Sequence, residues 1–136
     1  MQPMKPALVP ELDVADLDES LRFYVEVCGF RVLYGRPEER FAYLEREGAE
    51  LMLQQLSADQ QIRLDPAVGQ SWVIYLRVDD IEALHARLKR GGFPVSEIAP
   101  TSYGTRECFV SDPDGYELWI SVPIASAGDS EEDDEG

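Results

Sequence analysis

Hydrophobic and polar positions in residues 8–14 (LVPELDV) alternate with the period of a β-strand. Leu12 and Val14 fall on one face of this strand, and the acidic residues Glu11 and Asp13 fall on the other. The pattern predicts a strand with one face in the core and one polar face.

The pattern then changes to a helical period that begins after Asp16 and ends at Gly29. Asp16 is a favourable N-cap residue, and glycine is a common helix terminator. The apolar positions at helical spacing are Leu17, Leu21, Tyr24 and Cys28. Three alternating stretches follow, at residues 30–34, 40–47 and 50–55. The order predicted for this part of the chain is therefore β-α-β-β-β.

The same order returns after a polar loop at residues 57–71. Residues 72–78 alternate as a strand, and Asp80 precedes a second helical stretch. Three more strands are predicted, at residues 93–98, 105–111 and 116–122. The amino-acid sequence also contains an internal repeat, since CGFRV (28–32) resembles GGFPV (91–95) and GAEL (48–51) resembles GYEL (115–118). The chain therefore predicts two copies of one supersecondary unit.

Two such copies predict a single α+β domain over residues 7–124, with modules at 7–56 and 71–124. A chain of 136 residues folds around one core. Each helix would cover one face of its sheet, so the two modules would form a curved mixed sheet with a concave trough and the helices on its outer face. Residues 1–6 are predicted as an N-terminal extension.

The charge of the chain is strongly acidic, with 27 acidic against 12 basic residues and a formal net charge of −15. Six of the acids lie in residues 125–136, which are predicted as a disordered acidic tail and leave −9 for the rest. Such a surface repels phosphate backbones, so nucleic acid is not an expected partner, whereas a cationic small molecule is favoured. No apolar run is long enough to span a membrane, and no signal peptide is evident, so a cytoplasmic protein is expected.

The cysteines and the histidine offer little catalytic chemistry. Cys28 and Cys108 are too few for a disulfide framework or a zinc cluster, and both are predicted as small buried residues. His85 lies in the second helical stretch beside Ile81 and Leu88, away from the predicted trough. It lacks the second histidine that a two-histidine metal motif requires.

Three features of the chain resemble the vicinal oxygen chelate superfamily, which contains glyoxalase I, extradiol dioxygenases, fosfomycin-resistance enzymes and bleomycin-resistance proteins. They are VADLDESLRFYVEVCGF (14–30), YGTRECFVSDPDGYEL (103–118) and the paired β-α-β-β-β order. The Val9-Pro10 pair and the FAYLERE stretch (41–47) resemble the bleomycin-resistance branch most. That resemblance implies a small acidic homodimer that sequesters a cationic antibiotic without altering it.

Metalloenzymes of the superfamily carry His or Glu ligands on the first and last strand of each module. Counting from the helix caps and from the turn glycines places these positions at Val9, Met52, Val73 and Trp119, none of which is a ligand for a divalent cation such as Zn²⁺ or Mg²⁺. Glu11, Glu50 and Glu117 stay open as displaced ligands for calcium or magnesium. No metal and no cofactor is expected.

The predicted function is metal-free binding of a small cationic and aromatic ligand in the trough, through carboxylates and flat apolar surfaces. The predicted ligand-binding residues are Glu11, Asp13, Phe41, Tyr43, Glu50, Met52, Trp72, Tyr75 and Trp119. Two alternatives stay open. One is a lyase, isomerase or dioxygenase that uses an unusual metal or a carboxylate acid or base such as Glu11, Glu50 or Glu117. The other is a fold used only for protein association, with the acids as a solvated sheet face and Trp119 in a dimer core.

A homodimer is predicted because Trp, Met and Phe side chains at the trough edges form an apolar patch that a 15.3 kDa monomer would leave in water. Small-angle scattering is expected to give the mass of two chains. A mass matching one chain would contradict this prediction.

Overall fold

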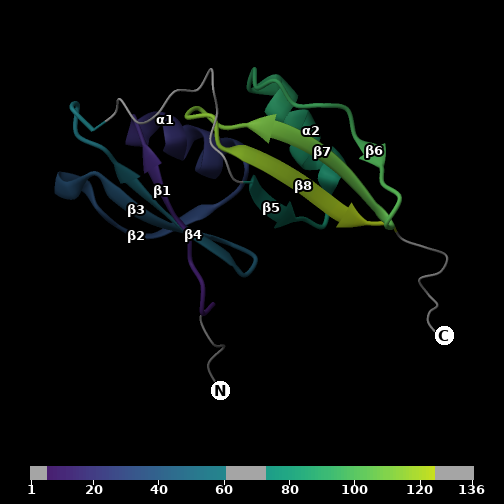
Figure 1. Ribbon diagram of the computed structural model, residues 1–136, viewed down its shortest axis with the longest axis horizontal. Helices are drawn as coiled ribbons and strands as arrows, with labels where there is room; N and C mark the ends of the chain where they lie inside the picture. The colour runs from purple at the N-terminus through teal and green to yellow at the C-terminus, as the bar shows by residue number, and fades with distance from the viewer. Residues whose placement is uncertain (1–5, 61–72, 125–136) are drawn as a thin grey trace. The chain divides into compact units, whose positions relative to one another are not determined.

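The computed structural model describes residues 6–60 and 73–124, which form two compact units with one four-stranded mixed sheet each (Figure 1). The first unit contains residues 6–60 together with the turn Asp112–Tyr116. The second contains residues 73–111 and 117–124. The predicted α+β fold of two tandem β-α-β-β-β modules is confirmed. The predicted acidic tail and Trp72 lie outside the described residues.

The first unit has the element order β1, α1, β2, β3, β4, with bounds Glu11–Val14, Leu17–Leu21, Arg31–Arg36, Phe41–Arg46 and Ala49–Gln55. Its sheet has the order β1-β4-β3-β2, in which β1 runs parallel to β4 and the other neighbours are antiparallel. Asp16 caps α1 as predicted, because its side chain accepts the backbone N–H groups of Asp18 and Glu19. Leu12 and Val14 are fully buried beneath the helix, as their alternation predicts.

The first helix continues past α1 as a π-helical segment over Arg22–Val27. The Cys28 N–H donates to the Phe23 carbonyl five residues back, at 2.9 Å. These wider turns rotate the buried face, so Phe23 and Val27 join the core while Leu21 is only half-buried. The predicted stripe is confirmed at Leu17, Tyr24 and Cys28, which are buried, and is wrong only at Leu21, because the prediction assumed the 3.6-residue period of an α-helix throughout.

The second unit repeats the arrangement with β5, α2, β6, β7 and β8, with bounds Val73–Arg77, Ile81–Arg90, Ala99–Pro100, Thr105–Ser111 and Glu117–Pro123. The sheet order β5-β8-β7-β6 matches that of the first unit element by element. Asp80 caps α2 through the Ala83 N–H at 3.0 Å, and Leu84 and Leu88 of α2 are fully buried. Figure 1 shows each helix lying on one face of its own sheet, which leaves the opposite face open. Neither α1 nor α2 is long and apolar enough to cross a membrane.

The strand predicted over residues 93–98 is wrong, because the structure has only the two-residue strand β6 at Ala99–Pro100. Pro94 has no N–H to donate to a strand ladder. Ser96 turns its carbonyl away from β7 toward the His85 Nε2 atom at 2.9 Å, and its hydroxyl accepts the Phe109 N–H at 2.8 Å instead. The segment therefore lies beside β7 without forming a regular ladder.

The turn between β7 and β8 packs into the first unit through buried carboxylates. The Tyr24 hydroxyl donates to the Asp112 carboxylate at 2.6 Å, and the Asp114 carboxylate accepts the Ala15 N–H at 3.1 Å. Asp112 also accepts the N–H groups of Asp114 and Tyr116, which closes the turn. Burial raises the pKa of Asp112 to about 6, although the hydrogen bonds that it accepts act to lower this pKa. Burial also raises the pKa of Tyr24 well above its usual value.

We expect Asp112 to make the protein less stable as the pH rises from about 4 to about 6. Its pKa is raised from 3.8 to about 6, so the folded state binds more protons than the unfolded state in this window, and folding loses that advantage as the pH increases. A difference of about two pKa units corresponds to roughly 3 kcal/mol. The measurement is the free energy of unfolding in urea at several pH values, for the natural protein and for Asp112→Asn.

The variant serves as the control because its amide stays neutral and keeps an acceptor oxygen for the turn. The difference in unfolding free energy between the two proteins should change with pH between 4 and 6 and be constant above 7. Parallel pH profiles would contradict the assignment of this proton to Asp112.

Candidate functional site

The open face of the first sheet carries six of the predicted ligand-binding residues. They are Glu11, Asp13, Phe41, Tyr43, Glu50 and Met52, which point away from the helix-covered face by strand alternation. Met52 on the central strand β4 is paired with Glu11 on one side and with Tyr43 on the other. The register therefore places an acid, a thioether and a phenol ring in one row across the sheet.

Three aromatic rings lie together on this face at the β2–β3 edge. The Tyr34 ring centroid is 5.4 Å from that of Tyr43 and 6.1 Å from that of Phe41. The Arg36 guanidinium lies 4.0 Å over the Phe41 ring, which is only 4% exposed. Phe41 is thus covered by its neighbours, whereas Tyr34, which the sequence reasoning did not single out, is 49% exposed.

The carboxylates of this face differ in how far they are engaged. The Tyr43 hydroxyl donates to Glu50 at 2.6 Å, and this bond raises the pKa of Tyr43. Glu11 is exposed and has no hydrogen bond or ion pair with the other described residues. Glu50 is therefore held by the protein, and Glu11 is available to an external cation.

The open face of the second sheet carries a row of three aromatic residues. Trp119 on β8 is paired with Tyr75 on β5 and with Phe109 on β7. The ring centroids of Phe109 and Trp119 lie 4.9 Å apart. Tyr75 is 42% exposed and Phe109 is 38% exposed. The indole N–H of Trp119 is buried and has no acceptor within the described parts of the chain. The row gathers three aromatic rings, of which those of Phe109 and Trp119 are tilted by 59° to each other, and exposed ring faces of this kind can contact a planar ligand.

A buried carboxylate, Glu107, lies in the next row of the same face. Its oxygens accept the hydroxyl groups of Tyr75 at 2.5 Å, Tyr103 at 2.9 Å and Thr105 at 3.0 Å. The Ser121 hydroxyl lies 2.9 Å from the Tyr75 hydroxyl, which can accept its hydrogen while donating its own to Glu107. Glu107 is 3% exposed, so these donors replace nearly all of its water.

The hydrogen bonds keep Glu107 ionised. Burial by itself would raise the pKa of Glu107, but the donated hydrogen bonds from Tyr75, Tyr103 and Thr105 outweigh it, and the pKa lies below its usual value. The same bond raises the pKa of Tyr103. The face therefore holds one fixed negative charge beside its aromatic row, with two phenol groups oriented by it.

Sequence reasoning placed Tyr75 and Trp119 on this face but missed Glu107, Phe109 and Tyr103. The signal for the first two was present, because alternation through TRECFVS (105–111) puts Glu107 and Phe109 on one strand face. Tyr103 could not be found in this way, because it lies in a loop and reaches Glu107 only through the turn at Gly104, which has a φ of 91°. Trp72 lies outside the described residues.

The positions at which the superfamily carries metal ligands do not fit a divalent cation in this chain. Val9 and Met52 occupy them in the first unit, and Val73 and Trp119 in the second, so no oxygen or imidazole donor is present at any of them. Among residues 6–60 and 73–124, no group of three or more His, Cys, Asp or Glu side chains is arranged to hold a metal ion.

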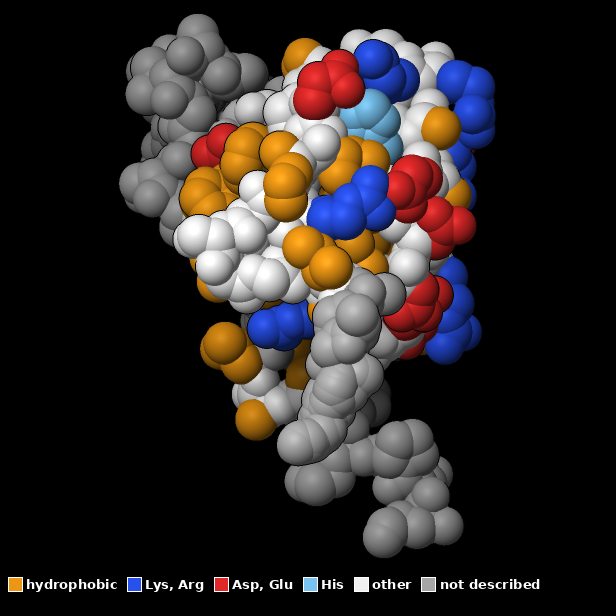
Figure 2. Space-filling model, turned by 90° about the vertical axis from the view of Figure 1, so that its right-hand side faces the viewer, with side chains coloured by type: hydrophobic (Ala, Val, Ile, Leu, Met, Phe, Trp, Pro, Cys, Tyr) orange, Lys and Arg blue, Asp and Glu red, His pale blue; other side chains and the backbone are white. Residues whose placement is uncertain are grey.

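Figure 2 looks onto the side of the molecule that carries β6 and shows small groups of hydrophobic side chains lying between acidic and basic ones. Larger apolar exposure occurs on the edge strand β2, where Val32, Leu33 and Tyr34 are between 38% and 49% exposed. The homodimer stays a prediction, and β2 offers an edge that a partner could cover.

Comparison with known proteins identifies the family to which this fold belongs. The chain belongs to the Glyoxalase/Bleomycin resistance protein/Dioxygenase superfamily, whose family model matches residues 9–120.

Relatives within this superfamily carry different names. The chain is 35% identical to a probable lactoylglutathione lyase of Vibrio parahaemolyticus over 128 residues, which cover 86% of this chain and 91% of that protein. It is 28% identical to the solved structure of TnmS3, an antibiotic binding protein from Streptomyces sp. CB03234, with a TM-score of 0.61. The match covers 89% of this chain and 99% of that one. A bleomycin resistance determinant encoded on the transposon Tn5 shares the fold at a TM-score of 0.67 and 23% identity, with coverage of 88% and 98%.

We expect Glu107→Gln to destabilise the protein by about 1 to 2 kcal/mol, because the charged acceptor of three hydroxyl groups is replaced by a neutral amide. The measurement is urea unfolding at pH 7. Glu117→Gln on the neighbouring strand is the matched control, since Glu117 is exposed and has no partner among the described residues, and its effect should stay within about 0.5 kcal/mol. Equal effects of the two substitutions would show that the hydroxyl network does not stabilise the fold.

Proposed function

We propose that this protein binds a small cationic and aromatic ligand on the open faces of its sheets, without a metal ion. An antibiotic of the bleomycin type is the ligand class that the sequence resemblance favours. The observation that carries the proposal is Trp119. It occupies a position where metalloenzymes of the superfamily carry a ligand, and its ring contacts that of Phe109 in a tilted arrangement with the centroids 4.9 Å apart.

The aromatic row suits a planar guest because it presents flat, partly exposed rings. Tyr75 is held in place by the bonds of its hydroxyl to Glu107 and Ser121, so little side-chain freedom is lost when a ligand stacks on it. Pre-oriented rings of this kind bind with a smaller entropic cost than mobile ones.

The charges of the same face favour a positive ligand. Glu107 is ionised in the row beside the aromatic residues, and Glu117, on the same face as Trp119, is exposed and has no hydrogen bond or ion pair with the other described residues. The whole chain carries a net charge of −15, which raises the local concentration of cations. Aromatic rings add cation–π attraction when the cation lies over their faces.

Two comparisons bear on the choice between binding and catalysis. The antibiotic binding protein TnmS3 supports the binding reading at 28% identity. The name lactoylglutathione lyase, carried by relatives at 35% identity, supports a lyase instead. We favour binding because Val9, Met52, Val73 and Trp119 supply no ligand for the cation that the superfamily's metalloenzymes hold at these positions.

We expect Trp119→Ala to weaken the binding of a cationic aromatic ligand by about 1 to 3 kcal/mol, because the substitution removes the central ring of the row. The measurement is isothermal titration calorimetry with bleomycin and with a panel of cationic aromatic antibiotics, after a thermal-shift screen has identified which of them bind.

The control is Leu8→Ala, since Leu8 is 84% exposed and lies outside both sheets. Circular dichroism checks that both variants fold. Unchanged affinity in folded Trp119→Ala would reject the role of Trp119. Absence of binding across the panel, together with turnover of S-lactoylglutathione by the purified protein after addition of Zn²⁺ or Ni²⁺, would replace the proposal with the lyase reading.

A further inference from the structure

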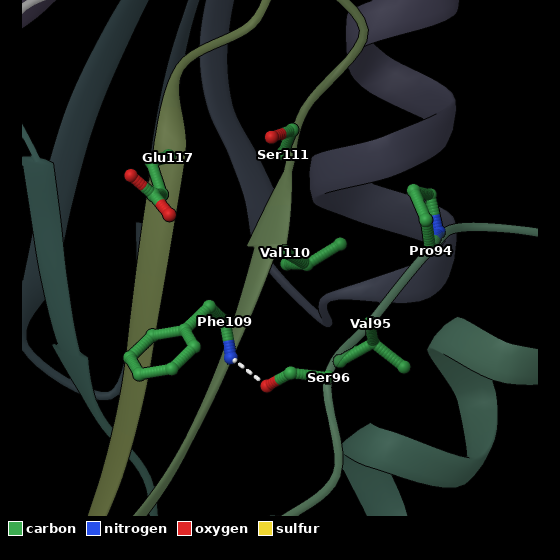
Figure 3. A pocket seen from close by; sticks show the side chains of 7 residues that line it. All are labelled: Pro94, Val95, Ser96, Phe109, Val110, Ser111 and Glu117. Carbon is green, nitrogen blue, oxygen red and sulfur yellow. Dashed lines mark hydrogen bonds between the residues drawn. The ribbon is translucent and has the colours of Figure 1, made fainter.

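A hollow of about 340 Å³ opens in the second unit where β7 separates from the segment before β6 (Figure 3). It is lined by Pro94, Val95, Ser96, Phe109, Val110, Ser111 and Glu117. This volume is at the lower end of the range of small-molecule sites. None of these residues belongs to the ligand-binding set that the sequence predicts.

The hollow exists because the segment is held to β7 at one residue only. The Ser96 N–H donates to the Phe109 carbonyl at 2.9 Å, and the Ser96 hydroxyl accepts the Phe109 N–H at 2.8 Å. The Ser96 carbonyl is bound by His85 of α2 at 2.9 Å, and Pro94 has no N–H to continue the pairing. On the Pro94–Val95 side of Ser96 the chain therefore lies apart from β7, whereas β6 pairs with β7 again at Ala99 and Pro100.

One part of the lining is apolar. Figure 3 shows Val110 of β7 directed toward the Pro94–Val95 stretch, and Phe109 adds a ring that is held at 4.9 Å from Trp119. Hydrocarbon groups that enter the hollow would be removed from water by Phe109, which is 38% exposed, and by the half-buried Val95.

The other part of the lining is polar and negatively charged. Ser111 and Glu117 are direct cross-strand partners, and alternation places both on the face that also carries Phe109. Both side chains are exposed, and Glu117 has no hydrogen bond or ion pair with the other described residues. A carboxylate and a hydroxyl oxygen thus lie beside an apolar hollow, and no cationic side chain within residues 6–60 and 73–124 forms an ion pair with this carboxylate.

We propose that this hollow binds a primary arylalkylammonium group. The ammonium donates to the Glu117 carboxylate and the Ser111 hydroxyl, and the hydrocarbon part packs against Phe109 and Val95, while the buried Val110 forms the floor on the other side of β7. An ammonium has three donors and no acceptor, which matches two acceptor side chains. One carboxylate and one hydroxyl are too few to hold a metal ion, and an anion would be repelled. The inference rests on the proposed function, since it makes the hollow the subsite for the cationic arm of the ligand that stacks on the neighbouring row.

The test uses three probes of nearly equal size and different charge, namely 3-phenylpropylammonium, 3-phenylpropan-1-ol and 3-phenylpropionate. Each is titrated into the full chain at low ionic strength, where interactions of an exposed carboxylate are least screened, and backbone amide shifts are followed by NMR. We expect saturable shifts at Ser96, Phe109, Ser111 and Glu117 with the ammonium, weaker binding of the alcohol and no binding of the carboxylate.

Two substitutions separate the charge of the hollow from its shape. Glu117→Gln should weaken the ammonium about three- to tenfold and leave the alcohol unchanged, since only the charge is lost. Val95→Phe should weaken both probes, because the larger ring fills the hollow. Glu26→Gln removes one exposed negative charge from the first unit and should change the binding of neither probe.

The proposal fails if the ammonium shifts map elsewhere, if the three probes bind alike, or if Glu26→Gln weakens the ammonium as much as Glu117→Gln does. Its failure is distinguishable from that of the proposed function. Antibiotic binding that depends on Trp119 but not on Glu117 or Val95 would overturn only the subsite. Saturable ammonium binding in the hollow, without binding of any antibiotic, would overturn only the proposed function.

Discussion

The two-residue period of the strands, combined with one helix per module, is the constraint on which the rest of the structure depends. Each sheet has two faces, and the module supplies a helix for only one of them. Leu12, Leu118 and the other apolar residues of the helix side are thereby committed to the core. Every residue between them must lie on the open face, so the chemistry of that face consists of whatever the alternate positions carry.

The open faces carry acids, and the acids fall into two physical classes. Glu50 and Glu107 are engaged by tyrosine hydroxyls, which satisfy their oxygens and orient the phenol rings. Glu11 and Glu117 are exposed and without partners among the described residues. The engaged acids stabilise the surface, and the others leave charge for an external cation. If all of these acids were exposed and without partners, the face would be an ordinary solvated sheet surface.

The internal repeat shows how one framework acquired two different surfaces. Met52 and Trp119 occupy equivalent positions, four residues after the turn glycines Gly48 and Gly115. Two residues after Met52 and Trp119 come Gln54 on β4 and Ser121 on β8. Phe41 is the cross-strand partner of Gln54, and Glu107 is the partner of Ser121, so Phe41 and Glu107 are equivalent. Where the first unit buries a ring under a guanidinium, the second buries a carboxylate under three hydroxyl groups. The backbone tolerates both, since either arrangement satisfies the side chain that it covers.

Much of the fold was determined by the sequence alone, because the alternation of apolar residues, the caps Asp16 and Asp80 and the repeated glycines act over short distances. The same local signals were enough to place Glu11, Met52, Tyr75 and Trp119 on open faces and to show that the metal-ligand positions lack donors. Tertiary structure alone decided which acids accept hydroxyl groups, because Tyr103 meets Glu107 through a loop and Tyr75 reaches it across the intervening strand β8. It also decided that residues 93–98 leave the sheet. The bond from His85 to the Ser96 carbonyl joins a helix to a loop 11 residues away, and no periodicity in the sequence encodes such a contact.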